Sequence, residues 1–299
     1  MSGLGKTVIA GVIIAVIGLL VLLVALGMNG WSFNNDYEIK TYDCTTDIDT
    51  LKIDYAAGVL KTEYYDGEKI KIEYPESKSY KATISESESV LNFETEYKFR
   101  FFHFNFWQQM PPAVIKIPKN NILSIDLVMN AGTVDIASGQ YTEIKANLNA
   151  GTLNLENIEC DNFYNKLNAG NVKIQDLKTG NSTFEMNAGD IKISNLECSD
   201  SFFKVNAGNI LIKNLNCNSI KSTLNAGKLT VEKALSQNVD FDINAGTITM
   251  KMVGRKEEYN IIVIKDSGSC NLQNQTVTDS SKKINLDIDS GNINIYFIQ

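Results

Sequence analysis

The chain has 299 residues, of which 43% are hydrophobic, so it can bury a sizeable core, and its formal net charge is −7. Binding to nucleic acid needs clustered Lys and Arg along a phosphate-tracking surface, and the basic residues here are scattered, which excludes nucleic acid as a partner. The five cysteines form no Cys-x-x-Cys pair and the sequence has one histidine, so we expect no metal site and no cofactor.

The first predicted element is a transmembrane helix over residues 8–28, a run without a charged residue. Such a run is long enough to cross a hydrocarbon core of about 30 Å. Lys6 precedes it and Asp36 follows it, which predicts a cytoplasmic stub (1–7) and an extracytoplasmic C-terminal part. The alternative is a cleaved signal peptide, because the small residues Ala25 and Gly27 lie near its end. Residues 29–49 are predicted to be a linker.

Apolar and polar residues then alternate over residues 50–129, which predicts short β-strands with one buried face. The turn-like stretches "YDGEK" and "YPESKS" favour antiparallel hairpins at residues 65–69 and 74–79. We expect this region to be a strand-rich cap of the fold.

An aromatic segment, "FRFFHFNFWQQMPP", interrupts this alternation at residues 99–112. One interpretation is a strand and loop that cover an end of the fold, because a repetitive sheet left open exposes its core and its edge. The functional interpretation is an exposed apolar patch that contacts a membrane or a partner. The candidate interaction patch is Phe101, Phe102, Phe104, Phe106 and Trp107.

The tripeptide Asn-Ala-Gly then recurs every 19 residues, and a strict period near 20 residues predicts a solenoid. Apolar residues stand four and six positions after each Asn, as Val134 and Ile136 do after Asn130, which predicts a strand in every coil. The Asn positions are Asn130, Asn149, Asn168, Asn187, Asn206, Asn225 and Asn244, and the Gly positions are Gly132, Gly151, Gly170, Gly189, Gly208, Gly227 and Gly246.

Each residue of the tripeptide has a geometric reason at a tight corner between stacked coils. Gly accepts a positive φ, Ala is small, and stacked Asn amides can hydrogen-bond along the column. We therefore interpret the Asn column as a structural ladder and not as a ligand site. Inside the coil, large and small residues compensate each other, as with Phe163 beside Asn165 and then Ser182 beside Phe184.

These patterns predict an all-β fold. It is a parallel β-solenoid (β-helix) of about seven 19-residue coils over residues 130–262, plus degenerate terminal coils and the N-terminal transmembrane helix. Two "DSG" stretches, at Asp266 and Asp289, predict further turns and a cap over residues 263–299.

Three cysteines, Cys160, Cys198 and Cys217, share one position of the 19-residue register. Cys198 and Cys217 are on adjacent predicted coils, within reach of a disulfide. The same column contains Tyr141, Thr179 and Ser236, so it tolerates polar groups, which favours free thiols and leaves the disulfide as the alternative.

No constellation of catalytic residues is apparent. The aspartates Asp135, Asp190, Asp240 and Asp242 occupy different registers, and there is no nucleophile elbow or phosphate loop. We expect no catalytic residue and a non-enzymatic protein.

The passage "VIKIPKNNILSIDLVMNAGTVDI" resembles a bacterial domain-of-unknown-function family named "putative adhesin", which includes the YvlB- and LiaG-like proteins. The shared features are an Ile-x-Ile-Pro strand, a small-residue corner ending in Gly, and Gly-x-Val-x-Ile rungs. The resemblance covers residues 45–299 and implies a β-strand-repeat domain outside the membrane, with no catalytic residues to transfer.

The predicted function is a single-pass cell-membrane protein whose extracytoplasmic solenoid binds or scaffolds at the cell envelope. Its partner is the membrane together with an envelope protein, a glycan or a cationic peptide. One alternative is an envelope-stress sensor or a sequestering surface for cationic peptides, consistent with the acidic balance. The other is a carbohydrate-active β-helix enzyme.

Overall fold

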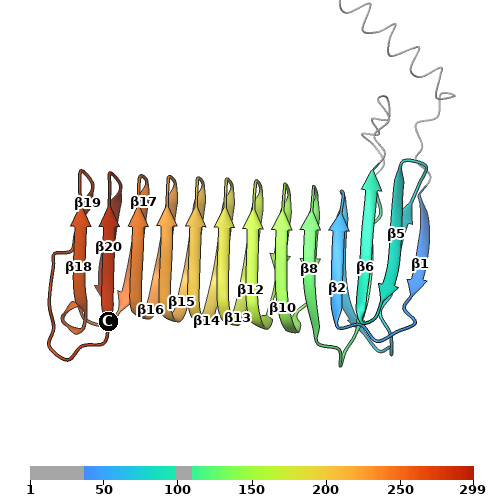
Figure 1. The fold of residues 1–299 in the computed structure, drawn as a ribbon, viewed down its shortest axis with the longest axis horizontal. Coiled ribbons are helices and arrows are strands. Elements are labelled where there is room, and N and C mark those ends of the chain that lie inside the picture. Colours follow the sequence, from blue (N-terminus) through green and yellow to red (C-terminus); the bar gives the residue numbers. More distant parts are fainter. Residues whose placement is uncertain (1–36, 98–109) are drawn as a thin grey trace, which may run out of the picture.

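The computed structural model describes residues 37–97 and 110–299, and this part of the chain is a long row of stacked β coils (Figure 1). Apart from β-strands, the described residues contain one short 3-10 helix, η1 (Lys256–Glu258). The predicted transmembrane helix at residues 8–28 lies outside the described residues. Within the described ranges, no helix combines the length and the apolar character that a membrane span requires.

The regular part of the row consists of parallel strands in register with a spacing of 19 residues. Ile191 pairs with Ile210, for example, and Ile210 with Leu229. The predicted parallel β-solenoid is confirmed for this part of the chain. Its strands are β8 (Leu123–Met129), β9 (Thr133–Ile136), β10 (Gly139–Leu148), β11 (Thr152–Leu155), β12 (Ile158–Leu167), β13 (Asn171–Met186), β14 (Asp190–Val205), β15 (Asn209–Leu224), β16 (Lys228–Ile243) and β17 (Thr247–Val253).

The core runs along the inside of the coils because side chains alternate between the interior and solvent in every strand. Phe163, Phe184 and Phe203 are buried in consecutive coils, and the rings of Phe184 and Phe203 stack with centroids 5.0 Å apart. Ser182 and Ser201 lie beside two of these rings and are also buried. The size compensation expected between the two inner columns is therefore present.

The N-terminal end of the row does not follow chain order. Its strands are β1 (Glu38–Asp43), β2 (Thr50–Tyr55), β3 (Val59–Tyr65), β4 (Lys71–Glu76), β5 (Tyr80–Ser87), β6 (Val90–Tyr97) and β7 (Ala113–Pro118). The coil made by β2 and β3 lies between the β8–β9 coil and the coil made by β6 and β7, and all of these pairings are parallel. Residues 50–65 are thus a coil of the solenoid itself.

Antiparallel strands complete this end, but not as the predicted hairpins. β3 and β4 both pair with β7 rather than with each other, and β4 pairs with β1, so the hairpins expected at residues 65–69 and 74–79 are wrong. The antiparallel hairpin joins β5 to β6 instead, through Glu88 with its positive φ of 55°. Local turn chemistry was outweighed by the long-range pairing of both strands with β7.

The C-terminal end is also out of chain order. Its strands are β18 (Asn260–Lys265), β19 (Ser269–Cys270), β20 (Lys283–Ile288) and β21 (Asn292–Ile298). The last coil in sequence, β20 and β21, is inserted between the β16–β17 coil and the β18–β19 coil. β18 is therefore the outermost strand, as Figure 1 shows, and it crosses the predicted boundary at residue 262.

Candidate functional site

The corner of each regular coil is the Asn-Ala-Gly tripeptide, and its Asn side chains form a continuous ladder. Each Nδ2 donates a hydrogen bond to the Oδ1 of the Asn one coil earlier, at 2.6–2.7 Å, from Asn149 onto Asn130 through to Asn244 onto Asn225. An Asn in the middle of the column, such as Asn187, both donates and accepts along the solenoid axis. Because the amides are hydrogen-bonded to one another, the Asn column has a structural role.

The glycine of each corner faces the backbone of the preceding coil. Gly189 has a φ of +123°, and a Cβ at this position would lie 2.2 Å from the carbonyl oxygen of Gly170. The same carbonyl oxygen accepts a hydrogen bond from the N–H of Asp190 at 3.0 Å. The close approach of the two corners therefore allows a backbone hydrogen bond between neighbouring coils, and only Gly leaves room for this approach.

The candidate interaction patch, Phe101, Phe102, Phe104, Phe106 and Trp107, lies outside the described residues. The strands that flank it are described. β6 ends at Tyr97 and β7 begins at Ala113, and they pair with β2 and β3, whose own connection is the corner Ala56-Ala57-Gly58. The described ends of β6 and β7 therefore lie beside the two strands that this corner joins.

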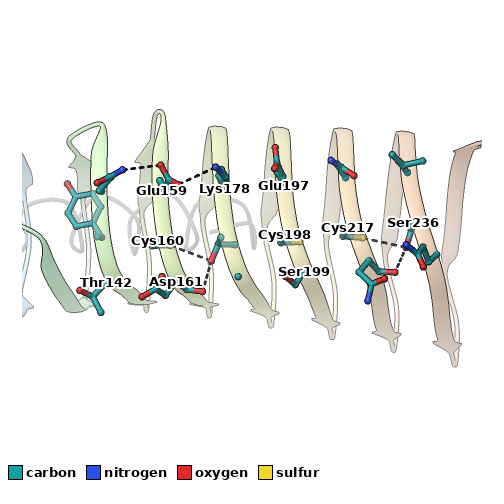
Figure 2. Close-up of a pocket in the computed structure, with 18 of the residues that line it drawn as sticks. Thr142, Glu159, Cys160, Asp161, Lys178, Glu197, Cys198, Ser199, Cys217 and Ser236 are labelled. Carbon is teal, nitrogen blue, oxygen red and sulfur yellow. Dashed lines mark hydrogen bonds and ion pairs between the residues drawn. The ribbon is translucent and has the colours of Figure 1, made fainter.

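A groove that the sequence did not reveal runs along the coils, and it has a volume of about 940 Å³ (Figure 2). We call it the cysteine groove, because the column of Cys160, Cys198 and Cys217 forms its floor. The remaining floor residues are Tyr141, Thr179 and Ser236, and Tyr259 lies at its C-terminal end. Its two rims are the residues on either side of that column: Gln140, Glu159, Lys178, Glu197, Asn216 and Leu235, and Thr142, Asp161, Gly180, Ser199, Asn218 and Gln237.

The groove exists because every strand bends just after the floor residue. In the pairing of β14 with β15, Cys198 faces Cys217 and Asp200 faces Ser219, while Ser199 is outside the register. The bend turns the strand from one wall of the coil to the next. In the sequence, the bend was indicated only by the floor column itself, which faces inward and yet contains polar residues such as Thr179 and Ser236.

The floor is hydrogen-bonded from coil to coil and its groups are buried. The Cys160 thiol donates to Thr179 Oγ1 and the Cys217 thiol to Ser236 Oγ, both at 3.6 Å. Burial raises the pKa of the Cys160 thiol to about 11. Burial also raises the pKa of Tyr141, whose hydroxyl donates to the carbonyl of Ala137.

The rim carries charges of both signs. Lys178 forms an ion pair with Glu159 at 3.3 Å across neighbouring coils. The hydrogen bonds from Gln140 and Lys178 lower the pKa of the Glu159 carboxyl. A carboxyl group held ionised in this way is a poor general acid, so the groove is better suited to binding than to proton transfer.

A second groove lies on the other side of the short wall formed by Leu177, Leu196 and Leu215, and its volume is about 880 Å³. It is lined by basic and acidic residues together: Lys61, Lys173, Lys192, Lys213, Glu63, Asp135 and Glu156. The aspartates Asp135, Asp190, Asp240 and Asp242 are thus not gathered in one groove. In the described part of the chain, no group of three or more His, Cys, Asp or Glu residues could hold a metal ion.

Comparison with known proteins gives a family and a fold. A family model described as "Toastrack DUF4097" matches residues 48–296. No curated protein matches the chain.

Three solved structures align with most of the chain at low sequence identity. The crystal structure of a "putative lipid binding protein" from Parabacteroides distasonis has 15% sequence identity and a TM-score of 0.51, covering 87% of this chain and 98% of that one. A "putative adhesin" from Bacteroides fragilis has 13% identity and a TM-score of 0.45, covering 86% and 97%. Another from Parabacteroides merdae has 12% identity and a TM-score of 0.47, covering 89% and 98%. At 15% identity, the similarity to the first of these structures shows the fold alone.

Proposed function

The chain belongs to the Toastrack DUF4097 family, and from this membership we propose that it is a membrane-anchored, extracytoplasmic binding or scaffold protein of the cell envelope. In this proposal, residues 8–28 are the anchor and the acidic solenoid stands outside the membrane. The solenoid presents its N-terminal end to an envelope component and catalyses no reaction.

The observation that carries the proposal is the position of the first described residue. Tyr37 lies beside Tyr80, and Tyr80 pairs with Tyr97, the last described residue of β6. Glu38 pairs with Glu76, four residues before Tyr80, which places the start of β1 at the same end of these strands. The first described residue, Tyr37, therefore lies at the same end of these strands as Tyr97, the last described residue before the aromatic segment in the sequence.

This proximity favours an interaction surface close to the membrane. An anchor holds whatever adjoins it near the headgroups, where Phe and Trp side chains gain most from leaving water. We accordingly assign the patch of Phe101, Phe102, Phe104, Phe106 and Trp107 to contact with the membrane or with an envelope partner. The solenoid would then project the two grooves away from the surface.

The non-enzymatic part of the proposal is supported by the chemistry of the cysteine groove. Its carboxyl groups Glu159, Asp161 and Glu197 lie on the rims, and Glu159 is already neutralised by Lys178. Glycoside hydrolysis needs one carboxyl group with a raised pKa next to an ionised one. The pKa of Glu159 is lowered and not raised, so this carboxyl group does not meet the requirement for the acid.

The test is cross-linking in cells that express the full chain, followed by affinity purification and identification of the captured envelope components. The variant is Phe104→Ser, Phe106→Ser, Trp107→Ser. The matched control is Tyr164→Ser, Phe202→Ser, which removes two half-buried aromatic side chains from the outer faces of β12 and β14. The proposal predicts that wild type and control capture the same component and that the triple variant loses it.

A second readout uses lipid vesicles, because one solved structure of similar fold is described as a lipid binding protein. Vesicles are incubated with a chain that lacks residues 1–36, in wild-type and triple-variant form. If the triple variant matches wild type both in its cross-linked components and in vesicle binding, the assignment of the patch is wrong.

A further inference from the structure

Two cysteines on neighbouring coils face each other. Cys198 on β14 and Cys217 on β15 are register partners in the parallel ladder, and both side chains point into the coil on the same side. Neighbouring strands lie about 4.8 Å apart, within the range of Cα separations that a disulfide bridges. Figure 2 labels both residues on neighbouring strands, and their side chains interact.

No other pair among the five cysteines has this arrangement. Cys160 is in the same column, but Thr179 occupies the coil between it and Cys198, which doubles the separation. Cys44 follows β1 and Cys270 ends β19, at opposite ends of the row. All five are free thiols in the structure.

The two cysteines lie next to a bend in their strands. Ser199 and Asn218, which follow the two cysteines, are outside the paired register, so each strand bends at this point. The bend lies on the floor of the cysteine groove, where Cys198 and Cys217 are 9% and 6% exposed.

The surroundings make the two thiols unequal. Ser182 Oγ donates to Cys198 Sγ at 3.8 Å, whereas the Cys217 thiol lies beside Ser236 Oγ at 3.6 Å. The contact between the two thiols is the main cause that lowers the pKa of Cys198 and raises the pKa of Cys217. This direction favours Cys198 as the attacking thiolate, with Cys217 as the second thiol.

We propose that Cys198 and Cys217 form a redox pair that closes a disulfide between adjacent coils by exchange with a small-molecule disulfide. The Cys198 thiolate attacks one sulfur of the disulfide RSSR, the S–S bond breaks, and the first RS⁻ leaves and is protonated to RSH. Cys217 then loses its proton and attacks the Cys198 sulfur of the mixed disulfide, which releases the second RS⁻ as RSH. The two cysteines are oxidised by two electrons and RSSR is reduced to two RSH.

The test uses oxidised glutathione as the probe and the full chain in detergent. After exposure, remaining thiols are alkylated under denaturing conditions and the protein is digested with trypsin. Lys204 and Lys213 lie between the two cysteines, so cleavage separates peptide 193–204 from peptide 214–221 unless a disulfide joins them. The proposal predicts this joined peptide, the loss of two thiols, and a melting temperature several degrees higher that reverts with dithiothreitol.

Two variants sharpen the result. Cys217→Ser should stop at a glutathione adduct on Cys198, because the second thiol is missing, and Cys160→Ser should leave the joined peptide unchanged. The proposal is overturned if wild type keeps all its thiols, or if the joined peptides involve a different cysteine pair. The wild-type peptide map decides the question even if Cys217→Ser does not fold.

Discussion

Within one corner, Asn and Gly make different contacts with the neighbouring coil. The Asn side chains join neighbouring coils through their amides, and the Gly residues allow the backbones to approach at the carbonyl oxygen. Loss of either group therefore affects the contact between coils more than it affects the strand on which the residue lies. Two predictions at the residue scale separate these contributions.

The first prediction concerns the glycine. Gly189→Ala introduces both an unfavourable φ and a clash with the Gly170 carbonyl, so we expect a loss of about 3 kcal/mol in the free energy of unfolding. Gly254→Ala is the matched control. Its φ of +122° is nearly the same, but its Cβ would meet only Glu258 Oε2 at 3.7 Å, and we expect about 1 kcal/mol. Urea denaturation measures both; equal losses would show that the clash is absent.

The second prediction uses the polarity of the Asn ladder. Asn187→Asp removes the donor to Asn168 and places two acceptor oxygens together, so we expect a loss of about 1–2 kcal/mol. Asn130 only accepts within the ladder, from Asn149, and Asn130→Asp keeps that acceptor, so its stability should change by less than about 0.5 kcal/mol. If the two variants were equally destabilised, the order of donors and acceptors would be wrong.

At the scale of elements, the two ends of the row are completed differently, by a loop at the C-terminal end and by antiparallel strands at the N-terminal end. The segment between β19 and β20 covers the outermost strand: Asn274 Oδ1 accepts from the N–H of Val263, and Gln275 bridges Ile261 in the antiparallel sense. These contacts engage part of the edge of β18, which would otherwise be open to pairing with another chain. At the other end, Glu86 on β5 binds the loop that follows β1.

The charge of Glu86 gives a prediction that depends on pH. Burial opposes ionisation, but hydrogen bonds from Thr46, Thr45 and Tyr42 outweigh it and lower the pKa of the carboxyl to about 2. Because the pKa of Glu86 is lower in the folded than in the unfolded chain, its ionised carboxyl group stabilises the fold at pH values above the unfolded pKa near 4.5. This stabilisation is lost as the pH falls towards 2.

Glu86→Gln should therefore lower the free energy of unfolding at pH 7, by about 1 kcal/mol after allowance for solvent exposure. The difference from wild type should shrink as the pH falls from about 5 to 2. Glu94→Gln, on the exposed face of β6, is the control and should show little effect at any pH. If the difference in the free energy of unfolding between wild type and Glu86→Gln did not change with pH, the assigned hydrogen bonds would be wrong.

At the scale of the whole molecule, the sequence was informative wherever the repeat fixed the register. A 19-residue period determines which residues of β13 to β16 face each other, so the inner columns and the corner residues could be predicted. The order of the terminal coils could not be predicted. β2 lies between β6 and β8 through pairings far apart in the chain, and no local pattern specifies them.

The cysteine groove was also beyond prediction, for a different reason. It depends on the bend after each floor residue, and the sequence shows only a column that tolerates Tyr, Cys, Thr and Ser. Sequence reasoning identified Cys198 and Cys217 as neighbours but favoured unreactive thiols. It could not show that the pair lies on the floor of a groove.

The proposed function requires the solenoid to stand outside the membrane, attached by residues 8–28. The most direct measurement is labelling of lysines in intact cells with a membrane-impermeant reagent, together with fractionation of the full chain. The exposed lysines on the outer faces of the coils, such as Lys173 and Lys192, report on the solenoid. We predict that the full chain sediments with membranes and is labelled before permeabilisation. Labelling only after permeabilisation, or a full chain recovered in the soluble fraction, would contradict the account.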